Sequence, residues 1–111
     1  MKQETFEFQS IIYQIFIGQN KQDNFDIIDM SLEHYIWFHI ENEPSCHVIL
    51  QVENPLHKIP LQVLKKCAYL CKINSKAKNK KSTIIYTPIK NVKKTNIIGQ
   101  VLAFQCKTIN I

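Results

Sequence analysis

Residues 35–52 read YIWFHIENEPSCHVILQV, two apolar runs separated by the short polar segment ENEPS. This pattern predicts a β-hairpin. If a five-residue turn at 41–45 joins two antiparallel strands, Trp37 faces Ile49 and His39 faces His47. The intervening positions are apolar throughout and predict the face that packs on the core. They are Ile36, Phe38, Ile40, Cys46, Val48, Leu50 and Val52. The histidines then share the other, mixed face, whereas a shift of one residue in register would separate them.

The segments on either side of this hairpin predict further strands and a helix. Residues 5–20 read as two strands that end at Gly18, and residues 21–34 as a short helix or a loop. Pro60 suits the first turn of a helix over residues 61–78, and one apolar stripe of that helix would face the core. The stripe holds Leu61, Leu64, Cys67, Ala68, Cys71 and Ser75.

The last third of the chain predicts short strands. Residues 83–89 read as a strand, residues 90–100 as a lysine-bearing connection, and residues 101–111 as one bent strand or two short ones. The expected fold class is α+β, a mainly antiparallel sheet of about six strands with one long helix packed on it. For a chain of 111 residues we expect a single domain, 1–111, with one core.

Charge is divided unevenly along the sequence. Residues 1–53 hold all nine acidic residues and two lysines, a net charge of −7, and residues 54–111 hold twelve lysines and no acid, a net charge of +12. A basic face is the usual footprint of a nucleic-acid partner, and a solvated lysine surface is the alternative. All 14 basic residues are lysine. Without arginine forks for guanine, strong sequence readout is not expected.

Catalytic, metal-binding and membrane functions have weak support in the sequence. Cys67 and Cys71 lie one helical turn apart on the core face, without the spacing of a zinc knuckle. No carboxylate is placed to orient a histidine toward a cysteine, and no glycine elbow is present. We therefore expect reduced cysteines, no metal, no cofactor and no enzymatic activity. No apolar run reaches ~18–20 residues and the N-terminus does not resemble a signal peptide, so we expect a cytoplasmic protein, with the nucleus as the alternative.

The motifs taken together resemble the NFACT-R domain. These are IWFHIENEPSCHVIL, a helix ending in NS, IIYTPIKNVKKT and a late GQV, preceded by YQIFIGQNKQDN, and they span about residues 11–105. The spacing is most similar to the stand-alone eukaryotic branch of that family. Pro44 stands where large members commonly have glycine. The resemblance implies an RNA- or DNA-binding module, related in the large members to tRNA handling on stalled ribosomal subunits.

Residues on and around the hairpin are the candidates for nucleic-acid contact. We expect Lys90, Lys93 and Lys94 to contact phosphates of tRNA or rRNA. Asn20 and Lys21 would flank that surface, and His39, His47 and Tyr86 would stack or donate hydrogen bonds, with phosphate attraction added on protonation below ~6.5. A purely structural role for the two histidines is the alternative for that pair. For the whole protein, the alternatives are a DNA-binding module and an interaction subunit that docks on a ribosome or a partner protein.

Overall fold

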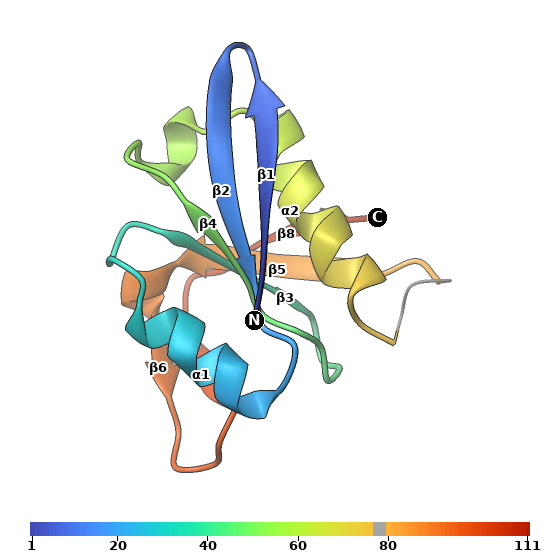
Figure 1. Ribbon diagram of the computed structural model, residues 1–111. Helices are drawn as coiled ribbons and strands as arrows, with labels where there is room; N and C mark the ends of the chain where they lie inside the picture. The colour runs from blue at the N-terminus through green and yellow to red at the C-terminus, as the bar shows by residue number, and fades with distance from the viewer. Residues whose placement is uncertain (77–79) are drawn as a thin grey trace.

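Six of the eight strands found among the described residues, 1–76 and 80–111, form one sheet in the computed structural model. In spatial order the sheet runs β1-β2-β4-β3-β5-β8 (Figure 1). These strands are β1 (Lys2–Phe8), β2 (Ile11–Ile17), β4 (Val48–Gln51), β3 (Ile36–Ile40), β5 (Thr83–Pro88) and β8 (Lys107–Asn110). Every neighbouring pair is antiparallel, which confirms the predicted sheet.

The first two strands form a long hairpin that extends from the body of the molecule (Figure 1). Its turn consists of Gln9 and Ser10, with φ values of 51° and 67°. Two successive residues with positive φ give the backbone twist that a two-residue hairpin needs. The turn leaves Ile11 and Ile12 exposed.

The central strands pair in the register that alternation predicts. Trp37 lies opposite Ile49 and Phe38 opposite Val48 in the β3–β4 ladder. The same register continued beyond the ladder brings His39 beside His47, and their ring centroids are 5.0 Å apart. The histidines therefore share one face of the sheet, as expected.

The opposite face of the sheet packs against α2 (Leu61–Ile73), which follows Pro60. The predicted core residues of the hairpin are buried there, with Cys46 half-buried. Leu61, however, is 52% exposed, so the predicted helical stripe is wrong at its first residue. Contact with the sheet begins further along, at Val63 and Leu64. The expected single long helix is not confirmed, because α2 has 13 residues and a second helix is present.

The histidine-bearing face is covered by α1 (Lys21–Asp29) and by a separate two-stranded ladder of β6 (Val92–Lys94) and β7 (Val101–Ala103). A second core lies beneath them, in which Ile27 and Val92 pack with Trp37 and Ile49. Residues 90–100 thus contain a strand and are not only a connection. The 3-10 turns η1 (Leu56–Lys58) and η2 (Ile89–Asn91) complete the described elements. Neither described helix is long and apolar enough to cross a membrane.

Candidate nucleic-acid interface

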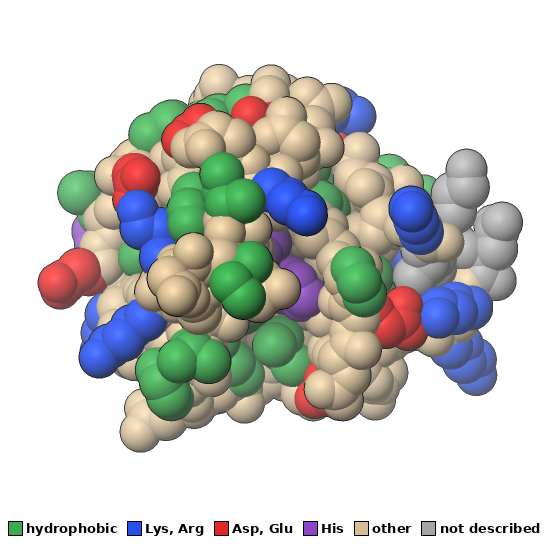
Figure 2. Space-filling model, turned by 90° about the horizontal axis from the view of Figure 1, so that it is seen from below, with side chains coloured by type: hydrophobic (Ala, Val, Ile, Leu, Met, Phe, Trp, Pro, Cys, Tyr) green, Lys and Arg blue, Asp and Glu red, His purple; other side chains and the backbone are tan. Residues whose placement is uncertain are grey.

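Two adjoining cavities open at one end of the sheet, where α1 begins and α2 ends. One has a volume of about 640 Å³ and contains His39 and His47, and we call it the histidine cavity. The other has a volume of about 850 Å³ and contains Cys46, and we call it the cysteine cavity. Five residues line both cavities, so together they form one depression, the basal groove. The shared residues are Lys21, Asn24, Glu43, Pro44 and Ser45. Seen from below, histidine side chains lie in a hollow between hydrophobic side chains, with a lysine beside them (Figure 2).

The two histidines are held by hydrogen bonds that fix their tautomers. The indole N–H of Trp37 donates to Nδ1 of His47 over 3.1 Å. Because an indole nitrogen can only donate, His47 carries its proton on Nε2. Nδ1 of His39 lies 2.6 Å from the carbonyl oxygen of Ile40, which can only accept, so His39 carries its proton on Nδ1. The ring of His39 also stacks on Trp37, with centroids 5.5 Å apart and an interplanar angle of 14°.

Burial keeps both imidazoles neutral. It lowers the pKa of His47 to about 3, with a contribution from the neighbouring His39. Burial also lowers the pKa of His39, partly offset by the bond to the Ile40 carbonyl. The expectation that protonation below ~6.5 adds phosphate attraction is therefore contradicted for His47, and for His39 burial shifts protonation to lower pH.

A buried asparagine connects the groove wall to the histidines. Oδ1 of Asn24 accepts the backbone N–H of His47 over 3.2 Å, and its side chain lines both cavities. Gly18 makes room for it, because a Cβ atom at Gly18 would lie only 2.1 Å from Asn24 Oδ1. Gly99, the other glycine of the chain, has φ +81° and packs against the first residue of α1. Because glycine has no Cβ, Asn24 can lie close to the backbone at Gly18, and Lys21 can lie close to the backbone at Gly99.

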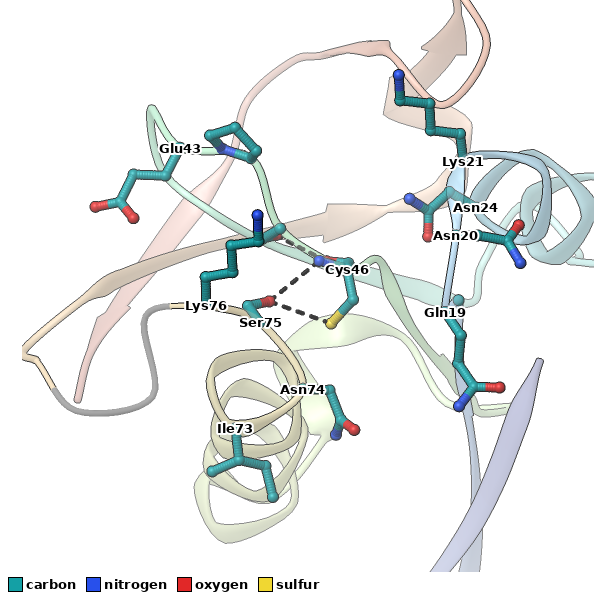
Figure 3. Close-up of a pocket in the computed structure, with 13 residues that line it drawn as sticks. Gln19, Asn20, Lys21, Asn24, Glu43, Cys46, Ile73, Asn74, Ser75 and Lys76 are labelled. Atoms are coloured by element: carbon teal, nitrogen blue, oxygen red, sulfur yellow. Dashed lines mark hydrogen bonds between the residues drawn. The ribbon is translucent and has the colours of Figure 1, made fainter.

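The cysteine cavity lies between the end of α2 and the start of α1 (Figure 3). Ser75 Oγ accepts the backbone N–H of Cys46 over 3.1 Å, donates to the carbonyl oxygen of Cys71 over 2.7 Å and lies 3.4 Å from Cys46 Sγ. The contact with the Cys71 thiol lowers the pKa of Cys46, partly opposed by burial and aided by Ser75, whereas the bond with Cys46 and burial raise the pKa of Cys71. All four cysteines are free thiols.

Lysines lie on both sides of the cysteine cavity. Lys21 comes from the first residue of α1 and Lys76 from the segment after α2 (Figure 3). Glu43 lies between the two cavities, and its carboxylate accepts a 2.8 Å charge-assisted hydrogen bond from Lys80. The groove thus combines neutral hydrogen-bonding groups in its floor with cations at its edge.

Asn20 has a structural role at this edge. Its Oδ1 accepts the N–H of Asp23 over 2.8 Å and caps α1, while the Asp23 carboxylate accepts the N–H of Gln19 over 3.0 Å. Asn20 also lines the cysteine cavity. The structure therefore places both Asn20 and Lys21 at the groove.

Tyr86 lies on the opposite face of the sheet from the histidines. It is 7% exposed and stacks on Phe38 in the core beneath α2. Ile85, its neighbour, faces the histidine cavity. Stacking of Tyr86 on a base was the expectation, but its ring packs in the core beneath α2 and lines neither cavity of the groove, so the structure contradicts that contact.

The lysines predicted to contact phosphates lie away from the groove. Lys94 pairs with Asp29 of α1 and lies over the Phe25 ring, with Nζ 5.2 Å from the centroid. Lys93 is exposed and lies opposite Leu102 in the β6–β7 ladder. Lys90 lines a separate cavity of about 450 Å³ beside His34 and His57. None of the three lines either cavity of the basal groove.

Sequence reasoning missed the loop that forms one wall of the histidine cavity. Ile97, Ile98 and Gln100 line this cavity together with Gly99. Both isoleucines are exposed, at 53% and 44%. The signal that could have found this wall is the late glycine, because only two glycines occur in the chain. Among the described residues, no group of three or more histidine, cysteine or acidic side chains is arranged to hold a metal ion.

Comparison with known proteins gives one family match and a set of relatives. Residues 2–104 match the family model described as NFACT protein RNA binding domain. Coiled-coil domain-containing protein 25 of Mus musculus is 38% identical over 90 residues, 78% of this chain and 43% of that protein. The Danio rerio protein of the same name is 35% identical over 117 residues, 96% of this chain and 56% of that protein. Protein JLP2 of Saccharomyces cerevisiae is 37% identical over 94 residues, 78% of this chain and 45% of that protein.

A solved structure shares the fold. The C-terminal part of the fibronectin/fibrinogen-binding protein from Streptococcus suis superposes with a TM-score of 0.84 at 23% identity, covering 100% of this chain and 45% of that one. The chain spans about half the length of the curated relatives it matches.

Proposed function

The chain belongs to the NFACT protein RNA binding domain family, and from this premise we propose that it is a non-enzymatic module that binds RNA in the basal groove. The family is one of binding modules, which supports binding rather than catalysis. Structured RNA with unpaired segments, such as tRNA or rRNA, is the proposed ligand, in a role connected with translation or ribosome-associated quality control.

The observation that carries this proposal is the basal groove itself. It is lined by residues from five chain segments that are distant in sequence, and both glycines of the chain allow these segments to pack closely. Its floor has two neutral imidazoles, and its edge has two lysines. Hydrogen-bonding and stacking groups with cations nearby are what unpaired RNA requires.

Each groove residue has a distinct role in the proposal. Lys21 and Lys76 contact phosphates on either side of the groove, and His39 and His47 contact the nucleotide between them. Asn24 holds the wall in place. Lys90, Lys93 and Lys94 lie outside the groove and take no part in this proposal, and their contact with phosphates stays a separate prediction, which the matched variant below tests for Lys90 and Lys93.

A protein-docking role is the second candidate, and the exposed side of the β6–β7 ladder favours it. Leu102 is 57% exposed and the following Phe104 is 48% exposed. Docking through this surface would leave the groove without a role, so mutations in the groove distinguish the two functions.

Charge reversal at the groove tests the proposal. The variant Lys21→Glu with Lys76→Glu is compared with Lys90→Glu with Lys93→Glu, which makes the same change of charge on exposed lysines outside the groove. Binding of tRNA, a hairpin rRNA fragment and duplex DNA is measured by fluorescence anisotropy over a salt series. Two phosphate contacts to unpaired RNA give a log–log salt slope of about −1.4. We expect the groove variant to lose at least about tenfold in affinity and most of this slope, and the matched variant to keep both.

The outcomes separate the candidates cleanly when circular dichroism shows that both variants are folded. Equal losses in the two variants would mean that RNA responds only to net charge. A larger loss in the matched variant would move the interface to the Lys90 and Lys93 surface. Wild-type protein that binds RNA no better than duplex DNA would support the DNA-binding alternative, and no binding at all would support docking on a protein.

A further inference from the structure

The histidine cavity has one free hydrogen-bond acceptor and one free donor in its floor. Nδ1 of each ring is already engaged, in His39 with the Ile40 carbonyl and in His47 with Trp37. In the neutral tautomers that these bonds fix, Nε2 of His39 can only accept and Nε2 of His47 can only donate. Within residues 1–76 and 80–111, neither Nε2 atom has a hydrogen-bond partner. The two rings meet edge to face, with centroids 5.0 Å apart at 84°, and His47 is only 1% exposed, so both line one cavity but His47 is reached only at its floor.

The remaining walls of this cavity carry both apolar and polar side chains, and the apolar ones come from three directions. Ile85 of β5 lies on one side, Pro44 of the hairpin turn on another, and Ile97 and Ile98 of the loop after β6 on the third. At about 640 Å³ the cavity is within the range of small-ligand sites, which are apolar with a few placed polar groups. Lys21 lines the same cavity, beside the apolar loop.

A nucleobase has the shape and the polar groups that match these walls. It is flat with apolar faces, and its Watson–Crick edge presents a donor beside an acceptor in each of the four bases. Those groups are occupied in a duplex and free only in an unpaired strand, where bases are read on this edge and stacked on aromatic side chains, histidine included. A phosphate accepts but does not donate, so it could pair with the His47 donor but would leave the His39 acceptor without a partner.

We propose, on the basis of the proposed function, that the histidine cavity takes one unstacked base of a single strand, with His39 Nε2 accepting from and His47 Nε2–H donating to its Watson–Crick edge. Lys21 contacts the phosphate beside that base. Since all four bases present a donor and an acceptor on that edge, the cavity selects unpaired over paired nucleotides and discriminates little among the four bases.

The test compares an unpaired strand with its duplex. A labelled RNA of about ten nucleotides, within the range of single-strand binding sites, is titrated alone and annealed to its complement. The variant His39→Phe keeps the ring stacked on Trp37 but removes Nε2. The matched control is His57→Phe, at an exposed histidine of the separate cavity near Lys90.

We expect the single strand to bind more tightly than the duplex, although the duplex carries twice the charge. His39→Phe should weaken single-strand binding about fivefold, the effect of one hydrogen bond, and leave duplex binding unchanged. His57→Phe should change neither. In wild-type protein, ring ¹⁵N spectra should show Nε2 of His39 and His47 shifting on addition of the strand, which tests the contact without any substitution.

Several results would overturn the base-binding proposal. Duplex binding equal to or tighter than single-strand binding would do so, as would equal affinities of His39→Phe and His57→Phe or unchanged ring ¹⁵N shifts. If the groove lysines still matter in these cases, RNA binding in the groove stands and only the base contact fails. If no RNA binds to the wild-type protein, the proposed function fails together with this inference.

Discussion

The buried, neutral state of His47 predicts that the domain loses stability as the pH falls below 6.5. Burial lowers the pKa of His47 to about 3, with a contribution from His39, whereas the histidine of an unfolded chain titrates near 6.5. Between these two values the unfolded chain binds a proton that the folded protein excludes. The stabilisation is therefore complete above pH 6.5 and decreases as the pH falls toward 3.

The size of the effect follows from this difference in pKa. At pH 5 the unfolded imidazole is almost fully protonated and the folded one is almost fully neutral, which costs the folded state about 2 kcal/mol. The figure changes little as long as the folded pKa stays below about 4, so it depends on the burial of the ring and not on the exact value. It is a large part of a total stability of roughly 5–15 kcal/mol.

Urea denaturation of the wild-type protein and of His47→Gln near pH 7.5 and near pH 5 measures this contribution. Glutamine can still accept the Trp37 N–H but cannot titrate in this range. We expect the free energy of unfolding to fall by about 2 kcal/mol more in the wild type than in the variant, while the contribution of carboxylates cancels. Equal decreases in the two proteins would refute the buried neutral histidine.

Three further predictions follow from particular contacts. Gly18→Ala should destabilise the domain by about 1–3 kcal/mol in thermal or urea unfolding, because its methyl group would displace the asparagine that supports the groove wall. Leu64→Ala should cost about 2–5 kcal/mol and Leu61→Ala less than about 0.5 kcal/mol, since only the first side chain is buried; equal costs would contradict the assigned helix face. Cys46, half-buried and with a lowered pKa, should react with iodoacetamide before the fully buried Cys67, whose pKa is raised by burial, and mass spectrometry of the labelled peptides would show the reverse order if the assignment is wrong.

The central hairpin is predictable from its sequence because its strands differ in pattern on the two faces. Every position on one face is apolar, and the polar turn limits the possible registers. Trp37 therefore lies opposite Ile49 as predicted, and His39 lies beside His47. The same reasoning does not predict that the second face is also covered. The residue types Trp37 and Ile49 are compatible both with a face exposed to solvent and with a face packed in a second core.

Tyr86 shows where alternation carries no information. Ile84 and Tyr86 pack beneath α2, while Ile85 packs on the opposite side, so β5 is apolar on both faces. A strand buried on both faces has a continuous apolar sequence, and the parity of any one residue cannot be read from it. The sequence therefore does not show that Tyr86 packs in the core and that Ile85 lines the cavity.

The basal groove is invisible in the sequence because it depends on tertiary contacts between distant segments. Residues near 20, 44, 75 and 98 line it, and no local pattern links them. The three-residue strand β6 is too short to show alternation, and its partner β7 begins seven residues after it ends. Lys94 thus looks like part of an open basic loop, although its side chain pairs with an acid of α1.

The fold brings the basic and the acidic parts of the sequence together in ion pairs. Lys80 and Lys94, from the basic part of the chain, pair with Glu43 and Asp29, from the acidic part. Figure 2 shows the result on one face, where lysines and acidic side chains lie among one another. Because the fold mixes the two parts, the net charge of +5 is a weak guide to the interface.

Phosphate attraction in the proposed interface then has to come from a few lysines placed beside neutral groups. A broad basic face making a handful of phosphate contacts would give a steep salt dependence, about −3 to −5 in log–log slope. A groove with two lysines and two neutral imidazoles would give a slope closer to about −1.4, and a larger share of its affinity would resist salt. The salt series therefore distinguishes two physical kinds of RNA binding, and the neutral histidines favour the one that depends less on charge.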